Sequence, residues 1–127
     1  MQVRVVEIMS TEPATVRFQC TAGTATAHWR GDLPTAETDY DVDWDIDPKL
    51  TWGVNAAMTG TASDLMEDQK PEVLVRGQVR SVENHGIVNV TVAGSTTLLE
   101  LLNAPQNLAG QWVELHAPKL SLWPYRV

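Results

Sequence analysis

Residues 39–47 alternate aspartate with an apolar side chain without a break, in the order Asp-Tyr-Asp-Val-Asp-Trp-Asp-Ile-Asp. In a β-strand, successive side chains point to opposite faces, so this conformation separates the two kinds of side chain completely. The pattern therefore predicts an antiparallel strand over 39–47 with one acidic and one apolar face. The acidic face would carry Asp39, Asp41, Asp43, Asp45 and Asp47, and the apolar face Tyr40, Val42, Trp44 and Ile46.

The acidic face breaks the usual composition of a strand. Aspartate is disfavoured in strands, and like charges on one face repel each other. Such a repeated violation indicates a functional cause. The charge is also local, since seven of the sixteen acidic residues lie between positions 32 and 47, leaving nine acids against nine bases in the rest of the chain. A patch of this sign attracts basic partners and repels phosphate backbones.

Length and composition predict a folded, soluble protein. Its 127 residues predict a single domain spanning 1–127. Hydrophobic residues make up 43% of the chain and charged residues 20%, which argues against disorder and against a membrane protein. The N-terminal residues resemble a strand and not a signal peptide, so we expect a cytoplasmic protein that does not enter a membrane.

Turn signals divide the rest of the chain into short alternating segments. Strands are expected at 3–9, 16–22, 24–30, 73–82, 87–93, 96–102 and 111–117. One short helix is expected over 61–70, because Thr or Ser residues that can cap a helix precede it and Pro71 follows it. Many short strands between turn signals favour a mainly-β barrel or sandwich.

The order of these elements resembles the OB-fold, a five-stranded barrel. Three strands and the aspartate strand precede the expected helix, and the Gly77-containing segment 74–82 and the segment 85–92 follow it. The resemblance is one of topology over about residues 3–93, without a family motif. It implies a small antiparallel barrel of the kind that binds oligonucleotides or oligosaccharides. The alternative is an SH3-like barrel made by 73–125, with the N-terminal meander packed against it.

Known catalytic and metal-binding motifs do not fit this sequence. A calcium loop needs glycine at its sixth position and glutamate at its twelfth, but counting from Asp41 gives Ile46 and Trp52. The three histidines lack the spacing of a zinc site. There is no nucleophile elbow, phosphate-binding loop or dinucleotide-binding turn. The sequence therefore predicts a non-enzymatic protein with no metal and no cofactor.

Two hypotheses for function follow. In the first, the five aspartates at 39–47 dock a basic protein surface, as an inhibitor or immunity protein would, and nucleic acid is not bound. Arg17, His28 and Arg30 are expected to pair with some of these aspartates across the sheet without neutralising them all. In the second, an OB-type barrel holds an oligosaccharide or a single-stranded nucleic acid through exposed aromatic residues. The sequence does not specify an oligomeric state.

Overall fold

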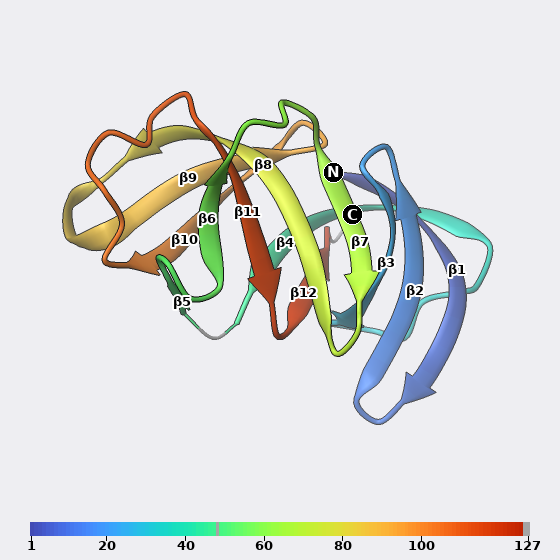
Figure 1. Cartoon of the computed structure of the whole chain (residues 1–127). Coiled ribbons are helices and arrows are strands. Elements are labelled where there is room, and N and C mark those ends of the chain that lie inside the picture. The colour runs from blue at the N-terminus through green and yellow to red at the C-terminus, as the bar shows by residue number, and fades with distance from the viewer. Residues whose placement is uncertain (48, 126–127) are drawn as a thin grey trace.

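The computed structural model describes residues 1–47 and 49–125 and consists mainly of β-strands (Figure 1). The strands are β1 (Gln2–Thr11), β2 (Ala14–Cys20), β3 (Gly23–Trp29), β4 (Thr38–Ile46), β5 (Leu50–Thr51), β6 (Ala56–Thr59), β7 (Leu65–Gln69), β8 (Glu72–Val82), β9 (Ile87–Val92), β10 (Ser95–Leu102), β11 (Trp112–Ala117) and β12 (Leu120–Pro124). A 3-10 turn, η1 (Asn84–Gly86), connects β8 to β9. The predicted mainly-β class is confirmed, and so is the aspartate strand, which is β4.

Five strands close into a barrel in the order β1-β2-β3-β12-β4, with β4 completing the circle against β1. When the barrel strands are numbered along the chain, the fifth one, β12, lies between the third, β3, and the fourth, β4. This order gives a small OB-like barrel. The expectation of a purely antiparallel barrel was wrong, because β12 runs parallel to β3. The chain leaves the barrel after β4 and returns only at β12, and such a long connection permits a parallel pair where a hairpin does not.

The long connection forms a second sheet in the order β5-β10-β9-β8-β11-β6, and β7 adds to β8 (Figure 1). Segments 74–82 and 85–92, which the OB-fold resemblance assigned to the barrel, lie in this second sheet as β8 and β9 with η1 between them. The barrel therefore comprises residues 2–46 and 120–124 instead of 3–93. The SH3-like alternative also placed the final strand wrongly, since β12 belongs to the OB-like barrel.

The helix expected over 61–70 was wrong, because Leu65–Gln69 form strand β7. β7 pairs antiparallel with β8, where Met66 lies opposite Val75. The Met66 side chain is fully buried, and its backbone N–H donates to the carbonyl oxygen of Ala22 in the barrel at 3.0 Å. A helix of this length is marginal from its own hydrogen bonds, so core burial and strand pairing outweigh local propensity.

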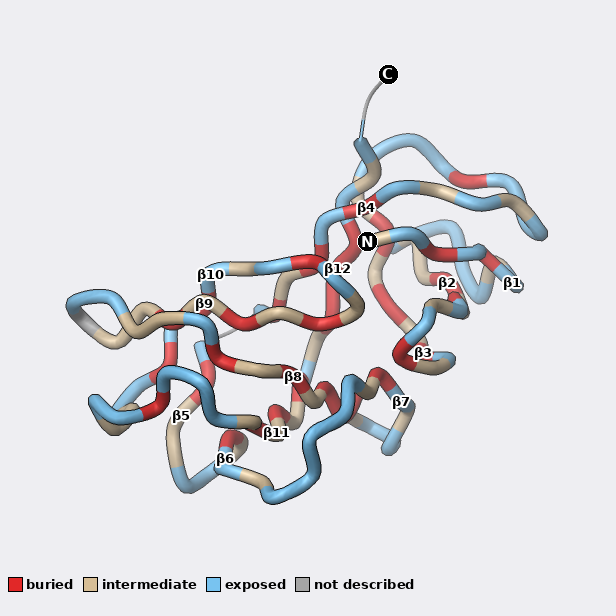
Figure 2. Tube along the Cα trace, turned by 90° about the horizontal axis from the view of Figure 1, so that it is seen from above, coloured by how far each residue is buried: buried red, intermediate tan, exposed pale blue. Residues whose placement is uncertain are grey.

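One buried apolar cluster includes residues of both sheets, and buried positions occur on the strands of each (Figure 2). Trp44 of β4 connects the two sheets. Its indole Nε1 donates to the carbonyl oxygen of Ser95 at 3.1 Å, and its own carbonyl oxygen accepts from Thr97 Oγ1 at 2.8 Å. Burial of such a large side chain stabilises the folded state by roughly 2–3 kcal/mol. The apolar side of the aspartate strand is thus held in the core.

Candidate functional site

The alternation of β4 separates its two faces as the sequence predicts. Val42, Trp44 and Ile46 are buried, and Tyr40 is half-buried. On the opposite face, four of the five aspartates are exposed and Asp45 is half-buried. Because β4 is part of the barrel wall between β1 and β12, its acidic side lies on the outer surface of the barrel.

An ion pair partly neutralises the start of this acidic row. Arg4 Nη1 on β1 lies 3.3 Å from Asp39 Oδ1, and both side chains are about half exposed. Solvent screens an exposed pair of this kind, so it contributes only about 0–1 kcal/mol to stability. Sequence analysis did not identify Arg4, because the pairing of β1 with β4 joins residues 35 positions apart.

The three basic residues expected to pair with the aspartates have other neighbours. Arg17 Nη1 lies 4.0 Å from Glu7 Oε2 in an ion pair, and Arg30 Nε donates to the hydroxyl of Ser121 at 3.3 Å. Over residues 1–47 and 49–125, no ion pair joins Arg17, His28 or Arg30 to an aspartate of the acidic row. The expected pairing was therefore wrong for this part of the chain.

Exposed aromatic residues of the C-terminal segment continue the acidic side of β4. Trp123 lies opposite Asp43 in the antiparallel register of β12 and β4. Tyr125 donates its phenolic proton to Asp43 Oδ1 at 2.8 Å and its backbone N–H to the carbonyl oxygen of Asp41 at 2.9 Å. Trp123 and Tyr125 are 51% and 54% exposed. We call Asp41, Asp43, Trp123 and Tyr125 together the acidic–aromatic face.

The hydrogen bond between Tyr125 and Asp43 also changes the acidity of the phenol. Donation to the Asp43 carboxylate favours the protonated phenol, and the negative charge of the same carboxylate opposes ionisation. Both effects raise the pKa of Tyr125 above its ordinary value, the hydrogen bond more strongly. Tyr125 therefore stays protonated, as the donor of this bond, to higher pH than an unperturbed tyrosine.

A groove of about 610 Å³, which we call the aromatic groove, adjoins this face. It is lined by Trp29, Arg30, Gly31, Asp32, Leu33, Pro34, Tyr40, Trp123, Pro124 and Tyr125. The rings of Trp29 and Tyr40 meet edge to face with their centroids 5.0 Å apart. Trp29 Nε1 donates to the carbonyl oxygen of Asp32 at 2.9 Å, and the backbone N–H of Thr35 donates to the Tyr40 hydroxyl at 2.8 Å. These bonds attach the loop that follows β3 to the barrel.

Arg30 lies inside the aromatic groove and modifies its charge. Its guanidinium carbon is 5.8 Å from the centre of the Trp123 ring, a cation–π distance. Its Nε is directed to Ser121, and its backbone N–H donates to the carbonyl oxygen of Leu122 at 2.9 Å. Arg30 therefore covers one face of Trp123 and leaves other parts of that exposed ring accessible.

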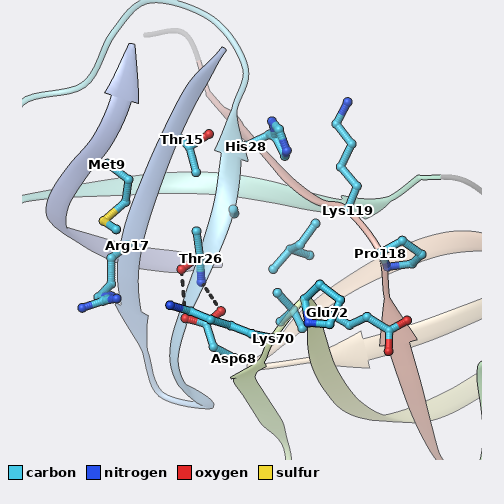
Figure 3. Close-up of a pocket in the computed structure, with 14 residues that line it drawn as sticks. Met9, Thr15, Arg17, Thr26, His28, Asp68, Lys70, Glu72, Pro118 and Lys119 are labelled. Carbon is cyan, nitrogen blue, oxygen red and sulfur yellow. Dashed lines mark hydrogen bonds between the residues drawn. The ribbon is translucent and has the colours of Figure 1, made fainter. Parts of the chain in front are cut away.

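A second groove, of about 630 Å³, lies over β2 and β3 on one side and the β7–β8 and β11–β12 turns on the other (Figure 3). Its basic side chains are those of Arg17, His28, Lys70 and Lys119, and its acidic ones are those of Asp68 and Glu72. Burial, followed by the nearby positive charges of Lys119 and Arg30, lowers the pKa of His28 and so favours its neutral imidazole.

Asp68, on β7 at this second groove, connects β7 to strand β3 of the barrel. Its two carboxylate oxygens accept hydrogen bonds from the backbone N–H and the hydroxyl of Thr26, both at 2.9 Å (Figure 3). The carboxylate is thus used in joining the sheets. The lining residues include no Trp or Tyr, so this groove lacks the exposed aromatic residues that the OB-type hypothesis requires.

Metal-ligand clusters, the free cysteine and membrane-spanning helices were considered in the described residues. Among positions 1–47 and 49–125, no three His, Cys, Asp or Glu side chains are arranged to hold a metal ion. Burial raises the pKa of the free Cys20 thiol, which reduces its reactivity. In the same residues, no helix has the length and apolar character needed to cross a membrane.

Comparisons with protein-family models, with curated proteins and with solved structures each found no match. The function is therefore inferred from the geometry of this chain alone.

Proposed function

We propose that this protein is a non-enzymatic binding module whose acidic–aromatic face docks a basic protein surface, as an inhibitor or immunity protein does. The observation that carries the proposal is the contact between Asp43 and Tyr125, which places exposed aromatic rings beside a row of carboxylates. Tyr and Trp are enriched among the residues that dominate interface energies. Carboxylates beside them add charge complementarity and direct a basic partner to the site.

The charge of the row supports the same proposal. Within the described parts of the chain, ion pairs reach Asp39 but none of Asp41, Asp43, Asp45 and Asp47. Uncompensated carboxylates on one face contribute repulsion to the folded state, whereas clustered charge accelerates association with an oppositely charged partner. The proposal includes a cytoplasmic location for the protein and its partner.

A pull-down with matched charge variants tests the proposal. The double variant Asp41→Asn/Asp43→Asn removes two charges from the face, and the control Glu12→Gln/Glu67→Gln removes two from exposed positions elsewhere. The parent and the control should capture the same basic proteins from an extract of the source cells, and the face variant should lose them. Binding of each captured protein should weaken as salt is added, mainly through slower association. Equal capture by both variants would contradict the proposal.

A ligand in the second groove is the alternative function. The groove lies over β2 and β3, and OB-fold proteins bind oligonucleotides and oligosaccharides at the face of their second and third strands. The support is weaker, because this groove has mixed charge and no stacking ring. We therefore expect negligible binding of a labelled single-stranded oligonucleotide at physiological salt, measured by fluorescence anisotropy. Micromolar affinity that falls steeply with salt and with Arg17→Gln would favour the alternative.

A further inference from the structure

The aromatic groove gathers exposed apolar side chains from two distant parts of the chain. Leu33, in the loop after β3, is 53% exposed, and it shares the groove with the half-exposed rings of Trp123 and Tyr125. Clustered exposed apolar side chains with a polar rim mark interaction sites, whereas singly exposed ones need no explanation. The volume of about 610 Å³ is within the range of ordinary ligand sites and accommodates a few side chains.

The floor of the groove is ordered before any partner arrives. Trp29 is buried against Tyr40, and the two hydrogen bonds that these rings make to the backbone of residues 32 and 35 hold the loop in place. Tyr125 is held by two hydrogen bonds to β4, one to Asp43 and one to Asp41. A site whose side chains are already positioned loses less conformational entropy on binding.

The charges around the groove select a cationic partner. Asp32 belongs to the lining, and the carboxylate of Asp43 adjoins the groove through Tyr125. Arg30 is the cation among the lining residues, and it is already engaged with Trp123 and Ser121. A cation of the partner is therefore directed to the carboxylates at the rim, while its apolar groups occupy the ring surfaces that Arg30 leaves accessible.

The lining of the aromatic groove favours one conformation of the bound segment. Four of the ten lining residues are aromatic, namely Trp29, Tyr40, Trp123 and Tyr125. A polyproline-II segment suits such a lining, because it docks its prolines between aromatic side chains without a backbone ladder.

We propose that the aromatic groove binds an extended, proline-containing basic segment of the partner protein, with prolines against Trp123, Tyr125 and Leu33 and a neighbouring Arg or Lys against Asp32 and Asp43. This inference rests on the proposed function and specifies how the partner is recognised. It adds an apolar component to binding that charge alone would not supply.

Tryptophan fluorescence and NMR titrations with three synthetic peptides test the inference. The first alternates proline with arginine, the second replaces each proline by alanine, and the third replaces each arginine by glutamine. The first peptide should bind more tightly than the second and the third, each by at least about tenfold, which corresponds to 1.4 kcal/mol. Shifts should centre on the indole resonances of Trp29 and Trp123.

Variants of the protein complete the test. Trp123→Ala and Leu33→Asn should each weaken binding of the first peptide at least about tenfold. Leu98→Asn, at a leucine that is 61% exposed on β10 and outside the aromatic groove, should leave binding unchanged. Because Leu33 is in an exposed loop, its variant remains informative if Trp123→Ala proves to be unstable.

The outcomes separate this inference from the proposed function. Equal binding of the proline and alanine peptides, lost in Asp41→Asn/Asp43→Asn but not in Trp123→Ala or Leu33→Asn, would overturn the groove and leave the acidic docking surface. Binding that depends on Trp123 and Leu33 but not on the aspartates or the peptide's arginines would overturn the basic part of both proposals. No binding of the first peptide would overturn the groove inference, and the pull-down would then decide the proposed function by itself.

Discussion

The phenolic oxygen of Tyr125 lies 2.8 Å from Oδ1 of Asp43, although the two residues are 82 positions apart in the chain. This hydrogen bond crosses from the end of β12 to the middle of β4. A backbone hydrogen bond from Tyr125 to Asp41 runs beside it. The acidic–aromatic face and the aromatic groove therefore adjoin each other and share Trp123 and Tyr125.

The first prediction concerns the ionisation of Tyr125. Because Asp43 raises the pKa of Tyr125 in the folded state, the phenol should ionise at higher pH than in the unfolded chain. The associated stabilisation is present below the unfolded-state pKa and is lost as pH rises through the folded-state pKa. In a Tyr40→Phe background Tyr125 is the sole tyrosine, and its phenolate absorbance reports the titration. Asp43→Ala should move the midpoint down; an unchanged midpoint would show that the hydrogen bond is absent in solution.

The second prediction concerns the stability cost of the acidic row. The triple variant Asp41→Asn/Asp43→Asn/Asp45→Asn keeps the side-chain shapes, so the new amide oxygen at position 43 can still accept from Tyr125, and it removes repulsion of a few tenths of a kcal/mol per close pair. Its melting temperature at low salt should equal or exceed that of the parent. The difference should shrink at high salt, where screening already weakens the repulsion. A large fall in melting temperature would mean that the carboxylates have a structural role.

The third prediction concerns the link between the barrel and the second sheet. Asp68→Ala removes both acceptors of Thr26 and should lower the free energy of unfolding by about 1–3 kcal/mol, because a half-buried donor loses its partner. Asp68→Asn keeps one acceptor oxygen and should cost less. The control Glu67→Ala changes the neighbouring exposed carboxylate. Denaturant titration measures all three, and a loss below about 0.5 kcal/mol for Asp68→Ala would refute the link.

The fourth prediction concerns the close packing at Gly77 in β8. A Cβ atom there would lie 2.6 Å from Cγ2 of Val92 and 2.7 Å from the carbonyl oxygen of Thr91. Gly77→Ala should therefore destabilise the protein by about 1–3 kcal/mol through overpacking. Gly60→Ala is the matched control, because nothing lies within 4 Å of its Cβ position. Thermal melts that give equal stability for the two variants would contradict the packing of β8 against β9.

Local patterns in the sequence predict the faces of individual strands well. The period-two alternation at 39–47 correctly places Trp44 inside and Asp41 and Asp43 outside, because the direction of a side chain in a strand depends only on the backbone conformation of that segment. The barrel resemblance was confirmed for a related reason, since turn residues and short alternating runs restrict the chain to a few β architectures.

Such local patterns do not predict which strands, distant in the sequence, pair with each other. The segment 65–69 has a composition compatible with a helix or a strand, and its pairing with β8 and the burial of Met66 determine that it is a strand. In the same way, no local signal places β12 between β3 and β4, although that placement brings Trp123 and Tyr125 to the aspartates.

The acidic half of the candidate site is thus readable in the sequence, and its aromatic half is not. Alternation is a property of consecutive residues, so Asp41 and Asp43 are recognisable from positions 39–47 alone. The contact with Tyr125 depends on hydrogen bonds between β4 and β12. In the sequence, β4 precedes the second sheet and β12 follows it, so this pairing forms only when the whole barrel closes. The geometry of the proposed docking surface is therefore decided by the tertiary structure, whereas its charge is already determined by the sequence.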